Sequence, residues 1–197
     1  MKNIHNQSEE FVKLLQNVEF RKKFLEKRIV FFWGAVMDDT AEEIVNQLLY
    51  LELIDPGKEI KMYINSPGGS VSAGLSIYDT MKMISSPVST ICMGMAASMG
   101  SVLLSAGEKG RRFIFPNAEV MIHQPSIGGV VQDQAANLYI TAEHIKKTKE
   151  RLIRLLSENT GQPYDKVMRD ADRDYWMDAN TSVQYGIVDD IINKIEL

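Results

Sequence analysis

The chain has 197 residues and a formal net charge of −4, and the absence of a basic run argues against an electrostatic nucleic-acid surface. This length suits one domain with its own hydrophobic core. No apolar stretch approaches the ~20 residues that span a bilayer, the N-terminus lacks a signal-peptide core, and a single cysteine, Cys92, excludes an intrachain disulfide. We therefore expect a cytoplasmic protein with neither nucleic-acid nor membrane partners.

The first elements are predicted as a helix, a strand and a second helix. Apolar residues at helical spacing favour an amphipathic helix over residues 8–18, and residues 28–34 fit a strand. A stripe of apolar residues predicts the next helix over residues 40–53. Between the first helix and the strand lies a basic stretch, most simply a solvated surface, which comprises Arg21, Lys22, Lys23, Lys27 and Arg28.

A glycine-rich loop follows the second predicted strand. Alternating apolar residues predict that strand over residues 60–64, and a helical repeat covers residues 70–84. The loop between them, Asn65-Ser66-Pro67-Gly68-Gly69, matches neither nucleotide-phosphate fingerprint, although an oxyanion hole for acyl transfer needs the same exposed backbone N–H groups. A plain turn that uses glycine for its backbone geometry is an equally good interpretation of this segment alone.

The next strand leads to a serine. Residues 88–93 form an apolar run typical of a buried strand and residues 99–106 resemble a short helix, so Ser98 lies at the corner between them. A helix N-terminus offers free N–H groups to a developing negative charge, which suits a nucleophile. Ala96 replaces the first glycine of the G-x-S-x-G elbow and disfavours an ordinary α/β-hydrolase. From this segment alone, a helix cap is the commoner role for such a serine.

The sequence contains only 3 histidines. Residues 119–123 predict a strand that ends in His123-Gln124-Pro125, and polar residues at the carboxyl ends of such strands gather at ligand sites. His5 lies near the N-terminus and His144 lies in a lysine-rich helical stretch. A serine nucleophile requires a base that titrates near pH 7, so His123 is the candidate base, with a purely structural role left open.

A long helix dominates the C-terminal part of the pattern. It covers about residues 132–159, and at ~1.5 Å per residue it would span about 40 Å, which suggests assembly with another subunit. A shorter helix over 163–171, an extended segment over 173–177 and a helix over 179–185 follow. The nearby aspartates match no EF-hand and no Cys/His cluster supports zinc, so no metal site is predicted.

Four ordered blocks closely resemble the ClpP serine peptidases, the proteolytic subunits of ATP-dependent Clp proteases, from about Arg28 to Glu196. The blocks are Tyr63-Ile64-Asn65-Ser66-Pro67-Gly68-Gly69, Gly94-Met95-Ala96-Ala97-Ser98-Met99-Gly100, Met121-Ile122-His123-Gln124-Pro125 and Asp172-Arg173-Asp174. The resemblance implies a crotonase-like α/β fold of repeated β-β-α units with a protruding handle helix at about 132–159. It implies a single peptidase domain over 28–197, after a divergent N-terminal segment over 1–27.

The resemblance also implies roles for individual residues. Ser98 would be the nucleophile, His123 the base and Asp174 the acid that orients the imidazole. The backbone N–H groups of Gly69 and Met99 would form the oxyanion hole. Asp174 is preferred among the nearby aspartates because the family's acid follows an arginine and precedes a short hydrophobic strand. Implied substrate contacts are Ser70, Val71, Ser126 and Ile127.

Assembly and partners are implied in the same way. Family members form two stacked heptameric rings, a tetradecamer whose chamber cleaves unfolded polypeptides to short peptides, fed by a Clp-family ATPase. The implied ring–ring contact is Asp172 with Arg173. The implied ATPase docking pocket comprises Tyr63, Met83, Ile91, Met93, Phe113 and Phe115. The chain has no Walker A sequence, so ATP would be used by the partner and no cofactor is expected in this chain.

Two departures from the family pattern favour a divergent paralogue. The usual N-terminal motif is missing, and Lys61 stands where an aromatic residue commonly lines the docking pocket. Both fit a chain that shares a mixed barrel with a second ClpP-like subunit. Two other classes stay open, a crotonase-type enzyme acting on acyl-CoA thioesters and a non-catalytic ring scaffold. Fluorophosphonate labelling of Ser98 discriminates the peptidase from both.

Overall fold

Strands and helices alternate along the chain, as the periodicity of the sequence predicts. The computed structural model describes residues 18–126 and 132–194. The strands are β1 (Ile29–Trp33), β2 (Ile60–Ser66), β3 (Val88–Ala97), β4 (Arg112–Ile114), β5 (Glu119–Ile122), β6 (Tyr175–Met177) and β7 (Asp190–Ile191). The helices are α2 (Asp38–Ile54), α3 (Val71–Met83), α4 (Met99–Ser105), α5 (Ala135–Thr160), α6 (Tyr164–Asp170) and α7 (Ala179–Tyr185), and residues 18–26 are also helical.

The predicted elements that fall in the described residues are present, with small shifts at most of their ends, but β3 continues past the predicted strand end at residue 93 to Ala97. β4 and β7 were not predicted, because strands of 3 and 2 residues are too short to display a period of two. The helix predicted over residues 8–18 lies outside the described residues except for its last residue. From there the chain stays helical to residue 26, through most of the basic stretch.

The strands form one sheet with an unusual branch at β3. The order β1-β2-β3-β4-β7 is parallel throughout. β4 pairs with residues 90–92 of β3, whereas β5 pairs with residues 95–97 along the same edge. β5 in turn pairs antiparallel with β6. One strand therefore carries two successive neighbours, and the second of them leads to the candidate site.

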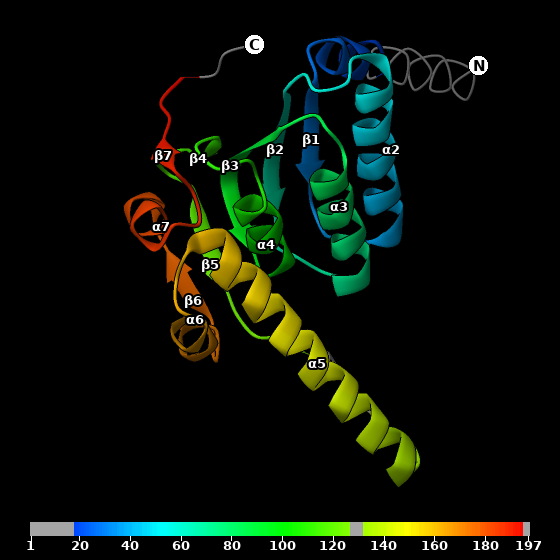
Figure 1. The fold of residues 1–197 in the computed structure, drawn as a ribbon, viewed down its shortest axis with the longest axis vertical. Coiled ribbons are helices and arrows are strands. Elements are labelled where there is room, and N and C mark those ends of the chain that lie inside the picture. Colours follow the sequence, from blue (N-terminus) through cyan, green and yellow to red (C-terminus); the bar gives the residue numbers. More distant parts are fainter. Residues whose placement is uncertain (1–17, 127–131, 195–197) are drawn as a thin grey trace, which may run out of the picture.

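Apolar side chains cover both faces of the sheet. Helices α2, α3 and α4 lie side by side on one face (Figure 1), over buried residues such as Ile60, Met62 and Ile64. Because side chains alternate along a strand, Tyr63 points to the opposite face. There it packs with Ile29 and with other apolar side chains, including one from the helical segment at 18–26.

Arg28 is buried, which contradicts its predicted place on a solvated basic surface. Its side chain donates hydrogen bonds to the carbonyl oxygens of Leu51, Lys58 and Glu59, at 2.8, 2.8 and 3.0 Å, and to Ser86 Oγ at 3.2 Å. The end of a helix leaves carbonyl groups without backbone donors, and a guanidinium can bond several of them at once. The other four residues of the stretch are exposed, as predicted.

Helix α5 extends away from the rest of the chain (Figure 1). It has 26 residues and ends at Gly161, whose φ of 75° is the left-handed conformation that glycine adopts readily at helix ends. Its buried residues, Leu152, Ile153, Leu156 and Asn159, all lie in the C-terminal half. Within the described part of this chain, no residue of the N-terminal half of α5 is buried.

Candidate active site

β3 bends midway along its length. Beside β2, Cys92 pairs with Ile64 and Ala96 pairs with Ser66, so β3 is longer than β2 between these pairs. Gly94 lies in this interval with φ 84°, and a Cβ there would approach Asn65 Oδ1 to 2.9 Å. A bulge of this kind bends a strand and re-aims the residues that follow it. Here it turns the end of β3 away from β4 and toward β5.

The pairing of three strands brings Ser98, His123 and Asp174 to one place. The last residue of β3 pairs with β5 near the end of that strand, and the last residue of β5 pairs with the first residue of β6. Ser98 and His123 directly follow β3 and β5, and Asp174 directly precedes β6. Strand register therefore sets their proximity, although they are far apart in sequence.

A chain of two hydrogen bonds joins these side chains. His123 Nε2 lies 2.9 Å from Ser98 Oγ, and His123 Nδ1 lies 3.0 Å from Asp174 Oδ1. An ionised carboxylate can only accept, so Nδ1 carries the proton and Nε2 is left to accept that of the hydroxyl. Ser98 is half-buried, while the side chains of His123 and Asp174 are 24% and 63% exposed.

Ser98 has a backbone conformation that is rare for a residue with a side chain. Its φ and ψ are 54° and −121°, and its N–H donates to the carbonyl of Met121 at 2.9 Å. Gly68 packs against it, because a Cβ at Gly68 would lie 2.6 Å from Ser98 Cβ and 2.8 Å from the carbonyl oxygen of Ala97. The glycine loop thus permits a strained corner that points the hydroxyl at His123.

The two N–H groups expected at an oxyanion hole lie beside this corner. Met99 is the first residue of α4, where no helical carbonyl can accept its N–H. Gly69 forms an isolated parallel bridge with Val36 that uses the N–H groups of Val36 and Ser70. The N–H of Gly69 is not part of this bridge, and any side chain at Gly69 would overlap the Val36 carbonyl.

Gln124, to which the sequence analysis gave no role, ties the site to α5. Its backbone N–H donates to the carbonyl of Ala171 at 2.6 Å, and its Nε2 donates to the carbonyl of Asp172 at 2.8 Å. Its Oε1 accepts from Lys149 Nζ at 2.7 Å. The sequence feature that could have pointed to Gln124 is its position directly after the candidate base, at the end of a strand.

The residues predicted to contact substrate or a second ring are close in sequence to Gly69, His123 or Asp174. Ser70 caps α3, where its Oγ accepts from the N–H of Ala73, and Val71 opens that helix. Ser126 is exposed, and Ile127 lies outside the described residues. The predicted ring–ring residues bond to each other within the chain, with Arg173 Nη1 3.2 Å from Asp172 Oδ2, and both are exposed.

Five of the predicted docking residues gather on the sheet face opposite α2–α4. They are Tyr63, Ile91, Met93, Phe113 and Phe115, of which Tyr63 and Ile91 are buried. Three of them, Tyr63, Ile91 and Phe113, line a cavity of about 310 Å³. Met83 is not part of this group, because it lies at the end of α3 with 85% of its surface exposed.

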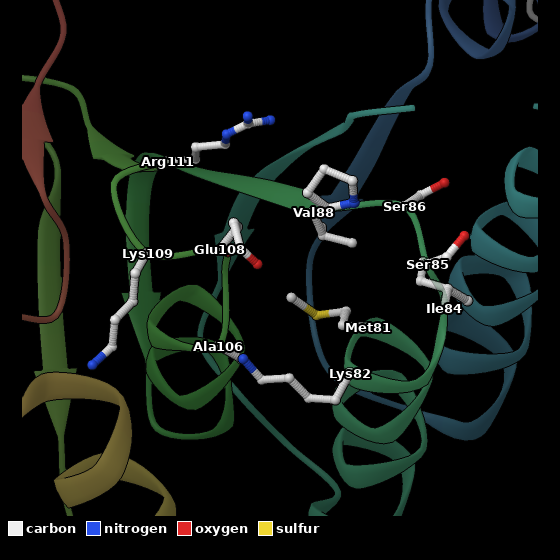
Figure 2. A pocket seen from close by; sticks show the side chains of 11 residues that line it. Met81, Lys82, Ile84, Ser85, Ser86, Val88, Ala106, Glu108, Lys109 and Arg111 are labelled. Atoms are coloured by element: carbon white, nitrogen blue, oxygen red, sulfur yellow. The ribbon is translucent and has the colours of Figure 1, made fainter. Parts of the chain in front are cut away.

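A larger cavity of about 530 Å³ lies at the other end of β3. Figure 2 shows it between the end of α3, which supplies Met81 and Lys82, and the segment after α4, which supplies Glu108 and Lys109. Its lining includes Val88, the first residue of β3, whereas Ser98 follows the last. This cavity is therefore separate from the hydrogen-bonded serine.

A cysteine nucleophile, a metal site and a membrane span each require features that can be sought in the described residues. Burial raises the pKa of the Cys92 thiol to about 12, so Cys92 is a core residue and a poor nucleophile. Between residues 18 and 126 and between 132 and 194, no group of His, Cys, Asp and Glu side chains could hold a metal ion. No helix in those ranges is long and apolar enough to cross a membrane.

A serine, a histidine and an aspartate bonded in this order are the arrangement that serine hydrolases use. A family model described as Clp protease matches residues 12–195, so the chain belongs to the Clp protease family. Membership confirms the predicted resemblance and the mixed α/β fold, and it implies a ClpP-like serine protease. Proteins of this family generally form rings and work with Clp ATPases.

Proposed function

We propose that this chain is the serine endopeptidase subunit of a self-compartmentalised, ATP-dependent protease. The observation that supports this most strongly is the imidazole of His123, whose nitrogens lie 2.9 Å from Ser98 Oγ and 3.0 Å from Asp174 Oδ1. These are distances at which a base can remove a hydroxyl proton while a carboxylate holds its ring. Ser98, His123 and Asp174 act as nucleophile, base and orienting acid.

Acylation begins when Ser98 Oγ attacks the carbonyl carbon of a peptide bond. His123 Nε2 takes the hydroxyl proton as the new O–C bond forms, and Asp174 stabilises the resulting imidazolium without itself becoming protonated. The carbonyl oxygen becomes negative and receives hydrogen bonds from the N–H groups of Gly69 and Met99. The C–N bond then breaks, and the leaving amine takes the proton from His123.

Deacylation repeats these steps with water. His123 removes a proton from the water molecule, whose oxygen attacks the acyl carbon, and then returns the proton to Ser98 Oγ as the ester bond breaks. The substrate lies extended between two segments that flank the serine. One carries Ser70 and Val71 directly after Gly69, and the other carries Ser126 and Ile127 after the candidate base.

A chamber of stacked rings accounts for the unpartnered part of α5. Leu138, Tyr139 and Ile140 are 38%, 70% and 65% exposed in its N-terminal half, and a second ring would cover them. Two heptameric rings stack as a tetradecamer in this proposal, with Asp172 and Arg173 at the ring–ring contact. The chamber admits only unfolded polypeptides and releases short peptides.

A Clp-family ATPase supplies the substrate in this proposal. It docks on Tyr63, Ile91, Met93, Phe113 and Phe115, with Met83 contributing from the end of α3. ATP is used by that partner, so this chain needs no cofactor of its own. The protein acts in the cytoplasm, and a second ClpP-like subunit shares its barrel.

The experiment that tests the function is hydrolysis of a short fluorogenic peptide by the purified, assembled chain. Fluorophosphonate should modify Ser98, and Ser98→Ala should abolish both labelling and hydrolysis. His123→Ala should also abolish hydrolysis, whereas His144→Ala, at an exposed histidine on α5, should not.

Absence of labelling in a correctly assembled protein would contradict the peptidase assignment and leave the scaffold or the acyl-CoA enzyme. The same assay should be run with and without a candidate ClpP-like partner. A stable and fully active complex of this chain alone would count against a shared barrel.

A further inference from the structure

We propose that Gln124 and Lys149 form a clamp that holds His123 and Asp174 in register, which makes Gln124 a positioning residue. This inference rests on the proposed function, because it concerns the same site. It starts from the fact that each atom of the Gln124 amide able to form hydrogen bonds has a partner on a different segment of the chain.

Strand pairing alone does not fix the candidate base against its acid. The antiparallel pairing of β5 and β6 ends at Ile122 and Tyr175. His123 and Asp174 lie just beyond this last pair, in residues that belong to no strand. The next backbone hydrogen bond between the two segments comes from Gln124, whose N–H donates to the carbonyl of Ala171 at 2.6 Å.

The side chain of Gln124 makes this connection directional. Its Nε2 lies 2.8 Å from the carbonyl oxygen of Asp172 and 3.4 Å from Asp172 Oδ1, both of which can only accept. Its Oε1 lies 2.7 Å from Lys149 Nζ, which can only donate. The two partners therefore fix which end of the amide faces which segment, and the reverse orientation would lose both bonds.

Lys149 supplies the charged member of the clamp from α5. Its side chain is 25% exposed, and its Nζ also lies 3.9 Å from Asp172 Oδ1. A hydrogen bond from an ammonium group is about twice as strong as one between neutral groups. Lys149 thus holds the Gln124 amide in place, and the amide holds the segment that leads to Asp174.

Removal of the clamp should slow the chemical step more than it weakens binding. Gln124→Ala keeps the backbone bond to Ala171 but frees the segment around Asp172, and a misplacement of about 1 Å can cost about 100-fold in rate. We expect kcat for a short peptide to fall roughly 10- to 100-fold, with KM changed less than about twofold. Lys149→Met should lower kcat by a smaller factor, and Lys149→Arg should restore most of it.

The matched control is Lys147→Met, because Lys147 is an exposed lysine on the same helix. It removes the same charge from α5 and should leave kcat unchanged. A double-mutant cycle provides the sharper test. If the two residues act as one unit, Gln124→Ala with Lys149→Met should be no slower than Gln124→Ala alone. Multiplied effects, or an equal loss in Lys147→Met, would overturn the clamp.

Two further measurements separate the clamp from folding, assembly and the function itself. Sedimentation and thermal unfolding should be unchanged in Gln124→Ala. These controls are needed because a loss of the rings or of stability would also slow hydrolysis. Exchange of the His123 C2 proton with solvent, followed by mass spectrometry, should be faster in Gln124→Ala than in the Lys147→Met control.

The exchange measurement needs no activity, so it tests the clamp even if the wild-type chain hydrolyses nothing. Unchanged exchange would refute the clamp, whereas a wild-type chain that is neither labelled nor active would refute the proposed function.

Discussion

The same edge of β3 carries two polar pairs that differ in burial. In the first half, Arg112 of β4 binds Asp189, which directly precedes β7. In the second half, His123 after β5 binds Asp174 before β6. Both pairs join a side chain on, or directly after, an inner strand to an aspartate beside an outer strand. The side chains of Arg112 and Asp189 are 6% and 23% exposed, whereas those of His123 and Asp174 are 24% and 63% exposed.

This difference suits the two pairs to different tasks. Arg112 donates from Nε and Nη2 to the two carboxylate oxygens of Asp189, at 3.0 and 2.6 Å, and from Nη1 to the carbonyl of Asn159 at 2.8 Å. A buried charge bound on all sides resists movement, and removal of its partner is expensive. A pair with an exposed aspartate adds little stability. Under the proposed function, the pair beside the first half of β3 serves stability and the pair beside the second half serves chemistry.

The largest expected effect is on catalysis, from Asp174→Asn. An amide can present an N–H to His123 Nδ1, and this favours the tautomer in which Nε2 carries the proton and cannot accept one from Ser98. The equivalent change in a comparable protease lowers kcat about 10⁴-fold. We expect kcat/KM for a short peptide to fall about 10³- to 10⁴-fold, measured beside a melting curve that shifts by no more than about 2 °C.

A large change in the melting temperature of Asp174→Asn would break the comparison, because it would give the exposed aspartate a structural task. Asp174→Glu is the companion variant. It keeps the charge but lengthens the side chain by one methylene, so it should recover part of the lost rate.

The next effect is on stability, from Asp189→Asn. The change leaves the Arg112 guanidinium buried without its counter-charge, which typically costs about 3–5 kcal/mol. We expect a loss of about 3 kcal/mol in the free energy of unfolding, measured in urea. The protein that remains folded should keep kcat within a few-fold of the wild-type value.

Replacement of both Arg112 and Asp189 tests whether the loss of stability in Asp189→Asn comes from the unpaired buried charge. Arg112→Met combined with Asp189→Leu removes the charges together, and it should be more stable than Asp189→Asn alone. A double variant that is less stable would show that other bonds of Arg112, such as that to Asn159, matter more than the ion pair.

The pH dependence of stability tests whether the charge of the Asp189 carboxylate is the source of this stability. Burial of Asp189 opposes its ionisation, but hydrogen bonds from the side chain and backbone of Arg112 outweigh this, so the pKa of Asp189 lies below its ordinary value. A lowered pKa in the folded state contributes stability above the unfolded pKa of about 3.9, and this is lost as the pH falls through the folded pKa. Urea unfolding from pH 3 to pH 7 should show the gap between wild type and Asp189→Asn narrowing below about pH 4. A gap that stays constant with pH would exclude the carboxylate charge as its source.

The sequence predicted the neighbours of the first half of β3 less completely than the helices. Periodicity identifies the long elements, but β4 and β7 are too short to produce it. Arg28 seemed part of a basic surface because its neighbours in sequence are lysines. Its burial depends on carbonyl groups of α2 and of the following loop, which no local pattern reveals.

The candidate site was predicted in unequal parts for a similar reason. Ser98 and His123 stand at strand ends, where position alone makes a polar residue a candidate. Asp174 was chosen only through the family resemblance, because the nearby aspartates have no distinguishing pattern. Gln124 and Lys149 meet through the register of β5 and the path of α5, so their contact could not be predicted before the fold was known.

The smallest expected effect concerns the bulge that separates the two halves, and it is tested by Gly94→Ala. Gly94 has φ 84°, a conformation that costs a residue with a side chain about 1–2 kcal/mol. The added Cβ would also lie 2.9 Å from Asn65 Oδ1, the atom that accepts the N–H of Met95 at 3.2 Å. We therefore expect a loss of about 1–2 kcal/mol in unfolding free energy together with a fall of about tenfold in kcat.

Gly57→Ala is the matched control for the bulge. Gly57 has φ 79°, close to that of Gly94, but a Cβ there would meet nothing within 4 Å. The control should lose a similar amount of stability and no activity. If both variants lose stability but keep their activity, the bulge has a structural role in β3 and does not position Ser98. If only Gly94→Ala also loses activity, the bend of β3 is what aims Ser98 at His123, and one strand serves two tasks because it changes direction between them.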